Sequence, residues 1–229
     1  NNEEMISKLR ATGGAGYTSI AGTGTALNIA NDANVLRAIG FTFNFYGTAY
    51  TQLYVSDNGY VTFGSGTNDA NNVDMAAGNV LGGRPAIMAH WDALNPTVAG
   101  AVDVFVQTTG VAGSRQFIVQ WNDLRIGTGT DGGTFQMVIQ EATGEVKIFY
   151  PDVGFTGTAN DNGSSATIGI QNGTGLATQH YFNTLNAATN GSSVSFRPSG
   201  ATMTDMVFRV TNQASHTTIE SNETYSLSL

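Results

Sequence analysis

Short segments in which apolar and polar residues alternate recur along the chain. Each predicts a β-strand with one face on a core and the other toward water. Phe41, Phe43 and Phe45, separated by threonine and asparagine, form one such segment. The same two-residue period occurs in residues 102–107, 117–121, 135–140, 146–150 and 194–197. Because helical periodicity is nearly absent, the pattern predicts an all-β protein.

Turn signals separate these segments. The residue pairs that tolerate a positive φ, as tight hairpins require, are Asn58-Gly59, Thr143-Gly144, Asn162-Gly163, Asn172-Gly173 and Asn190-Gly191. Residues 141–145 join two alternating segments and therefore predict a hairpin. The best helical candidate is residues 3–10, where acidic residues come first and basic residues last, as the helix dipole favours.

This pattern predicts a two-sheet antiparallel β-sandwich, jelly-roll-like or Greek-key, with an extra strand-forming C-terminal tail. We divide the chain into three parts. Residues 1–14 form a short helix or a docking strand, residues 15–198 form the sandwich, and residues 199–229 form the tail. No linker or charge block splits the chain further.

Composition narrows the choice of partners. The chain has 229 residues, of which only 11% are charged, against about 25% in an ordinary soluble domain. Its net charge of −8 repels phosphate backbones and anionic membranes, so we expect no nucleic-acid partner. The absence of cysteine excludes disulfides and thiolate chemistry. No apolar segment approaches the roughly 20 residues of a membrane-spanning helix, so we expect no transmembrane segment.

Several motifs, in order, resemble a known family. They include Phe45-Tyr46-Gly47, the segment 50–60 that ends in Asn-Gly-Tyr, the segment 85–92 that ends in Trp-Asp, Trp121-Asn122, and the segment 169–173. Together they resemble a secreted bacterial β-sandwich domain of the kind found in PEP-CTERM-type exported proteins, which is similar to the extracellular nidogen-like domain. The resemblance covers roughly residues 15–198 and implies an extracellular or cell-surface module that is structural or adhesive, with no known chemistry. Ala93 departs from the family pattern, where a second acid often stands.

Two acidic turns are candidates for Ca²⁺, which prefers six or more oxygen ligands. Asp57 and Asn58 supply too few oxygens, so we interpret them as a turn in which Asp57 accepts hydrogen bonds from nearby N–H groups. Asp69, Asn71 and Asp74 alternate like the ligands of a calcium loop but lack its glycine and distal glutamate. They remain weak candidates, and we expect no other cofactor.

We find no catalytic motif. His90 and Asp92 flank Trp91 at the end of a predicted strand, and we interpret His90 as an aromatic core position with a polar neighbour. Gly127, Gly129 and Gly132 have the spacing of a dinucleotide fingerprint, but a strand follows instead of the helix that would bind the phosphate. The sequence therefore predicts a protein that is not an enzyme.

Two surface functions remain open. Aromatic residues that could stack on sugars are Tyr46, Tyr50, Tyr54, Tyr60, Trp91 and Trp121, although packing is the stronger interpretation. The Asn-x-Ser/Thr glycosylation candidates are Asn162, Asn172, Asn190 and Asn222. The alternating apolar residues of the tail, which we assign to assembly, are Met206, Phe208, Val210, Tyr225, Leu227 and Leu229.

A terminal strand can pair with its own sheet or with a neighbouring subunit. We favour an extracellular structural subunit that assembles with copies of itself, through sheet edges and terminal strands, into a filament or surface layer. The alternative is a carbohydrate-binding or adhesion module that recognises surface glycans.

Overall fold

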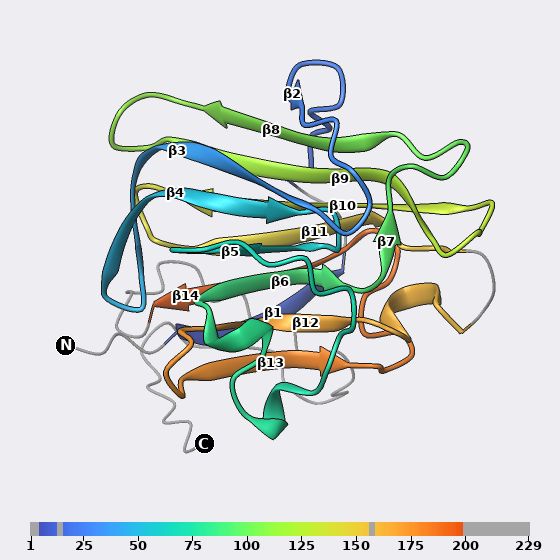
Figure 1. Cartoon of the computed structure of the whole chain (residues 1–229). Coiled ribbons are helices and arrows are strands. Elements are labelled where there is room, and N and C mark those ends of the chain that lie inside the picture. Colours follow the sequence, from blue (N-terminus) through green and yellow to red (C-terminus); the bar gives the residue numbers. More distant parts are fainter. Residues whose placement is uncertain (1–4, 13–15, 156–158, 199–229) are drawn as a thin grey trace, which may run out of the picture.

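The computed structural model describes residues 5–12, 16–155 and 159–198, and it confirms the two-sheet antiparallel sandwich (Figure 1). The larger sheet has the order β1 (Met5–Thr12), β14 (Ser192–Pro198), β11 (Val146–Asp152), β10 (Gly132–Gln140), β9 (Gln116–Ile126), β8 (Asp103–Thr109) and β2 (Thr25–Ala26), with β7 (Leu94–Asn95) paired to β9. The smaller sheet has the order β13 (Ala177–Phe182), β12 (Thr167–Gln171), β6 (Ala86–Trp91), β5 (Tyr60–Thr62), β4 (Thr48–Ser56) and β3 (Asn34–Phe45).

Strands that are consecutive in the sequence form most of both sheets, and the later strands β12 and β14 each pair with a strand from earlier in the chain. Strands β3 to β6 run as a meander in one sheet, and β8 to β11 run as a meander in the other. The chain then returns to place β12 beside β6 and β14 beside β11. Only short 3₁₀ turns interrupt the strands in the described residues: Met75–Ala77, Leu81–Gly83 and Asp161–Gly163. No described helix is long and apolar enough to cross a membrane.

The predicted alternation builds the core. Phe41, Phe43 and Phe45 are buried, whereas Thr42 and Asn44 between them are exposed. Facing side chains from the other sheet complete one apolar cluster, among them Phe117, Val119, Trp121, Phe135, Met137 and Ile139. The predicted hairpin at residues 141–145 is also confirmed, because it joins the antiparallel strands β10 and β11.

Three expectations are resolved or fall elsewhere. Residues Met5–Thr12 form the strand β1, which is the docking-strand alternative for residues 1–14 and not the helix, because pairing with β14 outweighs the charge pattern that favours a helix. Val102 precedes β8 and is 48% exposed, so it does not share the core face of Val104. The predicted tail, residues 199–229, lies outside the described residues.

The β3 edge of the smaller sheet is irregular in its middle. The register with β4 shifts between Ala38 and Phe43, which marks a bulge. The carbonyl oxygens of Ile39 and Gly40 there accept hydrogen bonds from the Thr108 hydroxyl and the Arg115 guanidinium, at 2.8 and 2.6 Å. These two carbonyl oxygens are therefore already hydrogen-bonded to side chains, although a further strand beside β3 would need them as acceptors.

Candidate functional site

The turn between β4 and β5 is part of the core. Asp57 and Asn58 are fully buried, and Asp57 accepts hydrogen bonds from the backbone N–H groups of Asp32 (2.8 Å) and Ala33 (3.0 Å). Asp57 therefore acts as an acceptor in a turn, as expected, but its partners lie far away in the sequence instead of nearby. Burial raises the pKa of Asp57 to about 7, although these N–H donors act in the opposite direction.

His90 also belongs to the core. Trp91 pairs with Thr167 and Met88 pairs with Gly169, so the register shifts and Ala89 and His90 occupy a bulge. The imidazole packs against the rings of Phe135 and Phe155, at centroid distances of 5.2 and 5.3 Å. Neither ring nitrogen has a hydrogen-bond partner in the described structure, and burial lowers the pKa of His90 to about 4.

Asp92 has structural partners rather than a catalytic one. It accepts hydrogen bonds from the Ser165 hydroxyl and from the N–H of Ala93, and burial raises its pKa. The glycine-rich stretch from Gly127 to Gly132 joins the antiparallel strands β9 and β10, so it has the hairpin context we expected and not that of a nucleotide loop.

The three calcium candidates have local roles. Asp69 accepts a hydrogen bond from the N–H of Asn71 (3.0 Å), and Asp74 caps a 3₁₀ turn by accepting one from Ala76 (2.9 Å). Within the described residues, no group of three or more His, Cys, Asp or Glu side chains could hold a metal ion. Binding of Ca²⁺ by Asp69, Asn71 and Asp74 stays a prediction.

The aromatic and glycosylation candidates occupy different surroundings. Tyr60, Trp91 and Trp121 are buried, whereas Tyr46, Tyr50 and Tyr54 are partly exposed.

The side chains of two glycosylation candidates stabilise turns. Asn172 accepts hydrogen bonds from the N–H groups of Thr174 and Leu176, and Asn190 accepts one from Val153 and donates one to Asp152. Asn162 lies half-buried in a 3₁₀ turn, and Asn222 lies outside the described residues. Glycosylation of these residues stays a prediction.

One terminal strand forms the margin of the larger sheet. Among the described residues, β1 pairs with β14 alone, with Met5 opposite Pro198 and Thr12 opposite Ser192. Its register shifts between Lys8 and Ala11. Strand β14 contributes Val194 and Phe196 to the core, so this margin borders well-packed structure.

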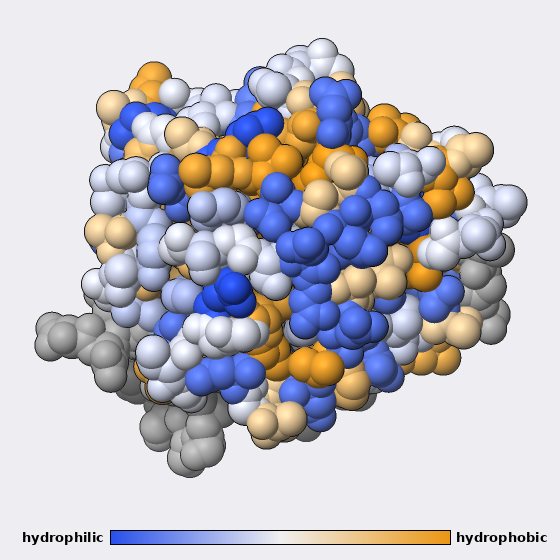
Figure 2. Space-filling model, in the orientation of Figure 1, coloured by the Kyte–Doolittle hydropathy of each residue, from blue (hydrophilic) through white to orange (hydrophobic). Residues whose placement is uncertain are grey.

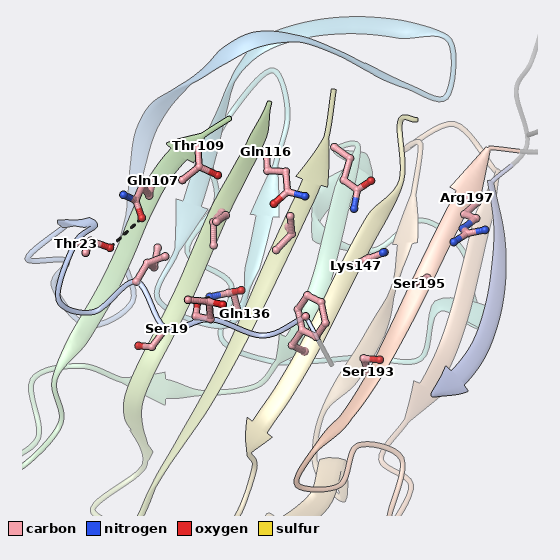
Figure 3. Close-up of a pocket in the computed structure, with 17 residues that line it drawn as sticks. Ser19, Thr23, Gln107, Thr109, Gln116, Gln136, Lys147, Ser193, Ser195 and Arg197 are labelled. Atoms are coloured by element: carbon pink, nitrogen blue, oxygen red, sulfur yellow. Dashed lines mark hydrogen bonds between the residues drawn. The ribbon is translucent and has the colours of Figure 1, made fainter. Parts of the chain in front are cut away.

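A groove of about 590 Å³ lies on the outer face of the same sheet (Figure 3). Its lining residues come from β8, β9, β10, β11 and β14 and from the segment 16–23, which crosses the strands. At one end Gln116 stands opposite both Thr109 and Gln140 on the neighbouring strands. Residues opposite one another on neighbouring strands form a row across the sheet. In the row next to Gln116, Gln107 lies opposite Ile118 and Lys147 lies opposite Ser195.

The segment 16–23 covers the rest of this face. Gln120 and Gln136, which alternation places toward water, are buried beneath it with 0% and 1% exposure. Gln120 accepts a hydrogen bond from the Ile20 N–H, and Gln136 donates one to the Thr18 carbonyl, both at 2.9 Å. The outer face of the sheet is therefore only partly open to solvent.

The groove offers no unpaired charge. Lys147 and Arg197, its two charged lining residues, both lie against Glu145, at 3.6 and 2.9 Å. The other polar lining groups are amides and hydroxyls. Sequence reasoning missed this site, although the signal was present. Glutamine occupies the outward positions of adjacent predicted strands, where charged residues are usual.

A second hollow, of about 510 Å³, is lined by Asp123, Asp131, Asp152, Asp161 and Arg125, among others. Most of these carboxylates have identified partners. Asp123 pairs with Arg125, Asp152 accepts from Asn190, and Asp161 accepts from the N–H of Phe155. On the face seen in Figure 2, hydrophobic groups are divided by a band of hydrophilic residues.

Fold and site together define a two-sheet β-sandwich module with the strand β1 at one margin and, beside it, a polar groove whose two cations are paired with Glu145. A family model described as "NIDO related" matches residues 8–219, so the chain belongs to this nidogen-related family. Domains of this family are generally extracellular, which fits a module of the structural or adhesion type. The match extends beyond the predicted domain of residues 15–198 at both ends. Comparison with curated proteins and with solved structures gives no match.

Proposed function

We propose that this chain is a non-catalytic extracellular structural subunit that assembles with copies of itself by exchanging its N-terminal strand. The pairing of β1 with β14 carries the proposal. A strand at a sheet margin can pair with the same margin of another copy, as in domain swapping. The β1–β14 contacts are the same whether β1 pairs within one copy or with a neighbour. The effective concentration of β1 and the geometry of the subunits therefore decide which of the two forms is favoured.

Exchange of this kind joins different surfaces of successive subunits. Each copy donates β1 and accepts a neighbour's β1 along β14. A heterologous contact that does not close into a ring propagates into a fibre. Main-chain hydrogen bonds supply the affinity, as in other forms of strand addition. The likeness to PEP-CTERM-type exported proteins, and assembly by the tail residues, stay predictions from the sequence.

The non-catalytic part of the proposal rests on the ionisable groups. Asp57, His90 and Asp92 have shifted pKa values, as catalytic groups often do. All three are buried, and they contact backbone groups, a serine or phenylalanine rings. Their pKa shifts are accounted for by packing, so we assign them no reaction.

The alternative of glycan binding through loop aromatics has less support. It needs two or three coplanar aromatic rings on one exposed face. Tyr60, Trp91 and Trp121 are instead part of the packed interior. We therefore place strand exchange first.

A cysteine pair tests the exchange directly, because the native chain has no cysteine. Lys8 and Ser195 are opposite each other in the β1–β14 pairing, so we would make Lys8→Cys/Ser195→Cys. The assembled protein is oxidised and run on a non-reducing denaturing gel. Strand exchange predicts a ladder of covalent oligomers.

Gln116→Cys/Gln140→Cys is the matched control, since both positions lie within the body of one sheet. It should give only an internally cross-linked monomer at every protein concentration. If Lys8→Cys/Ser195→Cys also gives only that monomer, β1 stays on its own subunit and the proposal is wrong.

A further inference from the structure

We propose that the open part of the groove binds an extended, uncharged segment of a different protein, which lies across the strands beside residues 16–20. This inference goes beyond the proposed function and does not depend on strand exchange. It rests on how the covered part of the same sheet face already binds a polypeptide segment.

The covered row provides an internal example of the recognition. Gln120 accepts from the Ile20 N–H and Gln136 donates to the Thr18 carbonyl, so the two amides bind successive peptide groups. Gln120 and Gln136 also bond to each other, at 3.0 Å, which orients both amides. A glutamine pair on adjacent strands can therefore bind a main chain that runs across the sheet.

The open rows repeat this chemistry. Gln116 and Gln140 are also opposite each other on β9 and β10. The side-chain amide of Gln116 makes no hydrogen bond to any described residue, whereas Gln107 and Gln140 use their Oε1 atoms to accept from Thr23 and Thr143. Figure 3 shows Gln116 beside Thr109 on the open part of the face, away from the crossing segment.

Charge and shape favour an uncharged polypeptide over other ligands. Because Lys147 and Arg197 are paired with Glu145, the groove has no free cation for an acidic ligand. Sugars usually stack on an exposed aromatic face. The groove's one aromatic ring, Phe149, is 6% exposed and covered by Gly16, where an added Cβ atom would lie 3.4 Å from the ring.

The width of the groove sets the length of the bound segment. From β8 to β14 there are four strand gaps of about 4.8 Å, or roughly 19 Å in all. An extended chain covers this distance with about six residues at roughly 3.3 Å each. In a second copy the equivalent segment 16–20 is already bound by that copy's own Gln120 and Gln136, so this segment is not free to fill the groove of a neighbour.

The probe for this site is a blocked, fluorescently labelled peptide with the sequence of residues 16–24, GYTSIAGTG, titrated into the full chain. We expect its fluorescence anisotropy to rise with saturation, and Gln116→Ala to weaken binding about tenfold. Gln52→Ala, an exposed glutamine on β4 of the other sheet, is the matched control and should leave the affinity unchanged.

Three outcomes would overturn the inference. The first is no saturable binding, or equal loss in Gln116→Ala and Gln52→Ala. The second is tighter binding of a neutral oligosaccharide that Gln116→Ala removes, which would assign the groove to glycans. The third is self-association of the full chain that Gln116→Ala abolishes and Gln52→Ala does not, which would assign the groove to a second copy.

Discussion

At the residue scale, the buried polar groups influence stability with opposite pH dependence. The pKa of His90 is about 4 in the folded state and about 6.5 when unfolded, so the unfolded state binds the proton first as pH falls. His90 therefore lowers the free energy of unfolding between pH 6.5 and 4. Asp57 has a raised folded pKa of about 7, so it increases that free energy on acidification over much of the same range.

His90→Phe tests this opposition. Phenylalanine fits between Phe135 and Phe155 and removes two buried nitrogens without partners, so the variant should be more stable than the native protein. Its advantage should grow by about 3 kcal/mol between pH 7 and pH 4, because only the native protein then loses the His90 contribution. Urea unfolding at both pH values measures the difference.

His180→Phe is the control, since His180 lies half-buried on the edge strand β13. A gain from His180→Phe that grows with acidification as much as that of His90→Phe would show that the pH dependence does not come from the His90 pocket. An advantage of His90→Phe that stays constant with pH would show that His90 titrates normally in the folded state.

At the element scale, alternation predicted the strands because side-chain direction in a strand has a strict period of two. The hairpin at residues 141–145 and the core face of β3 followed from local sequence alone. The partners of Asp57 and the cover over Gln120 did not, because they depend on segments 24 or more residues away. The same limit applies to β1. The charge order of residues 3–10 suits a helix, and only the presence of the β14 margin makes the strand preferable.

The turn between β4 and β5 lies close to the backbone of β6. Gly59 has a φ of +76°, and a Cβ atom there would lie 1.9 Å from the carbonyl oxygen of His90 on β6. Gly59→Ala should therefore destabilise the protein by roughly 2–5 kcal/mol, since both the backbone angle and the contact are unfavourable. Thermal or urea unfolding measures this loss.

Gly64→Ala provides the matched comparison. Gly64 has a φ of +81° but nothing within 4 Å of the added Cβ atom, so only the backbone angle contributes. We expect a loss of about 1 kcal/mol. Equal losses in the two variants would mean that the turn moves away from β6 at little cost.

At the scale of the whole molecule, the margin proposed for assembly and the groove proposed for binding lie on one sheet. The β14 margin and the groove share Ser195 and Arg197, and both leave the smaller sheet free. The two proposals are therefore compatible, since one uses the margin of the sheet and the other its adjoining face. Family membership fits an extracellular setting for such a module.

Locking β1 onto its own subunit should prevent assembly. The Lys8→Cys/Ser195→Cys variant, refolded at high dilution and oxidised, joins β1 to β14 within one chain. We expect this protein to remain monomeric in sedimentation and electron micrographs, and to assemble after reduction. Fibres formed by the oxidised monomer would show that another surface drives association.

The irregular β3 margin has a consequence for the shape of any assembly. Its bulge, and the Ile39 and Gly40 carbonyls already bonded to Thr108 and Arg115, prevent a further strand from pairing along it in continuous register. A neighbouring subunit then cannot extend the smaller sheet by adding a strand along β3. Subunits that add at β14 alone give thin, unbranched threads instead of widening ribbons.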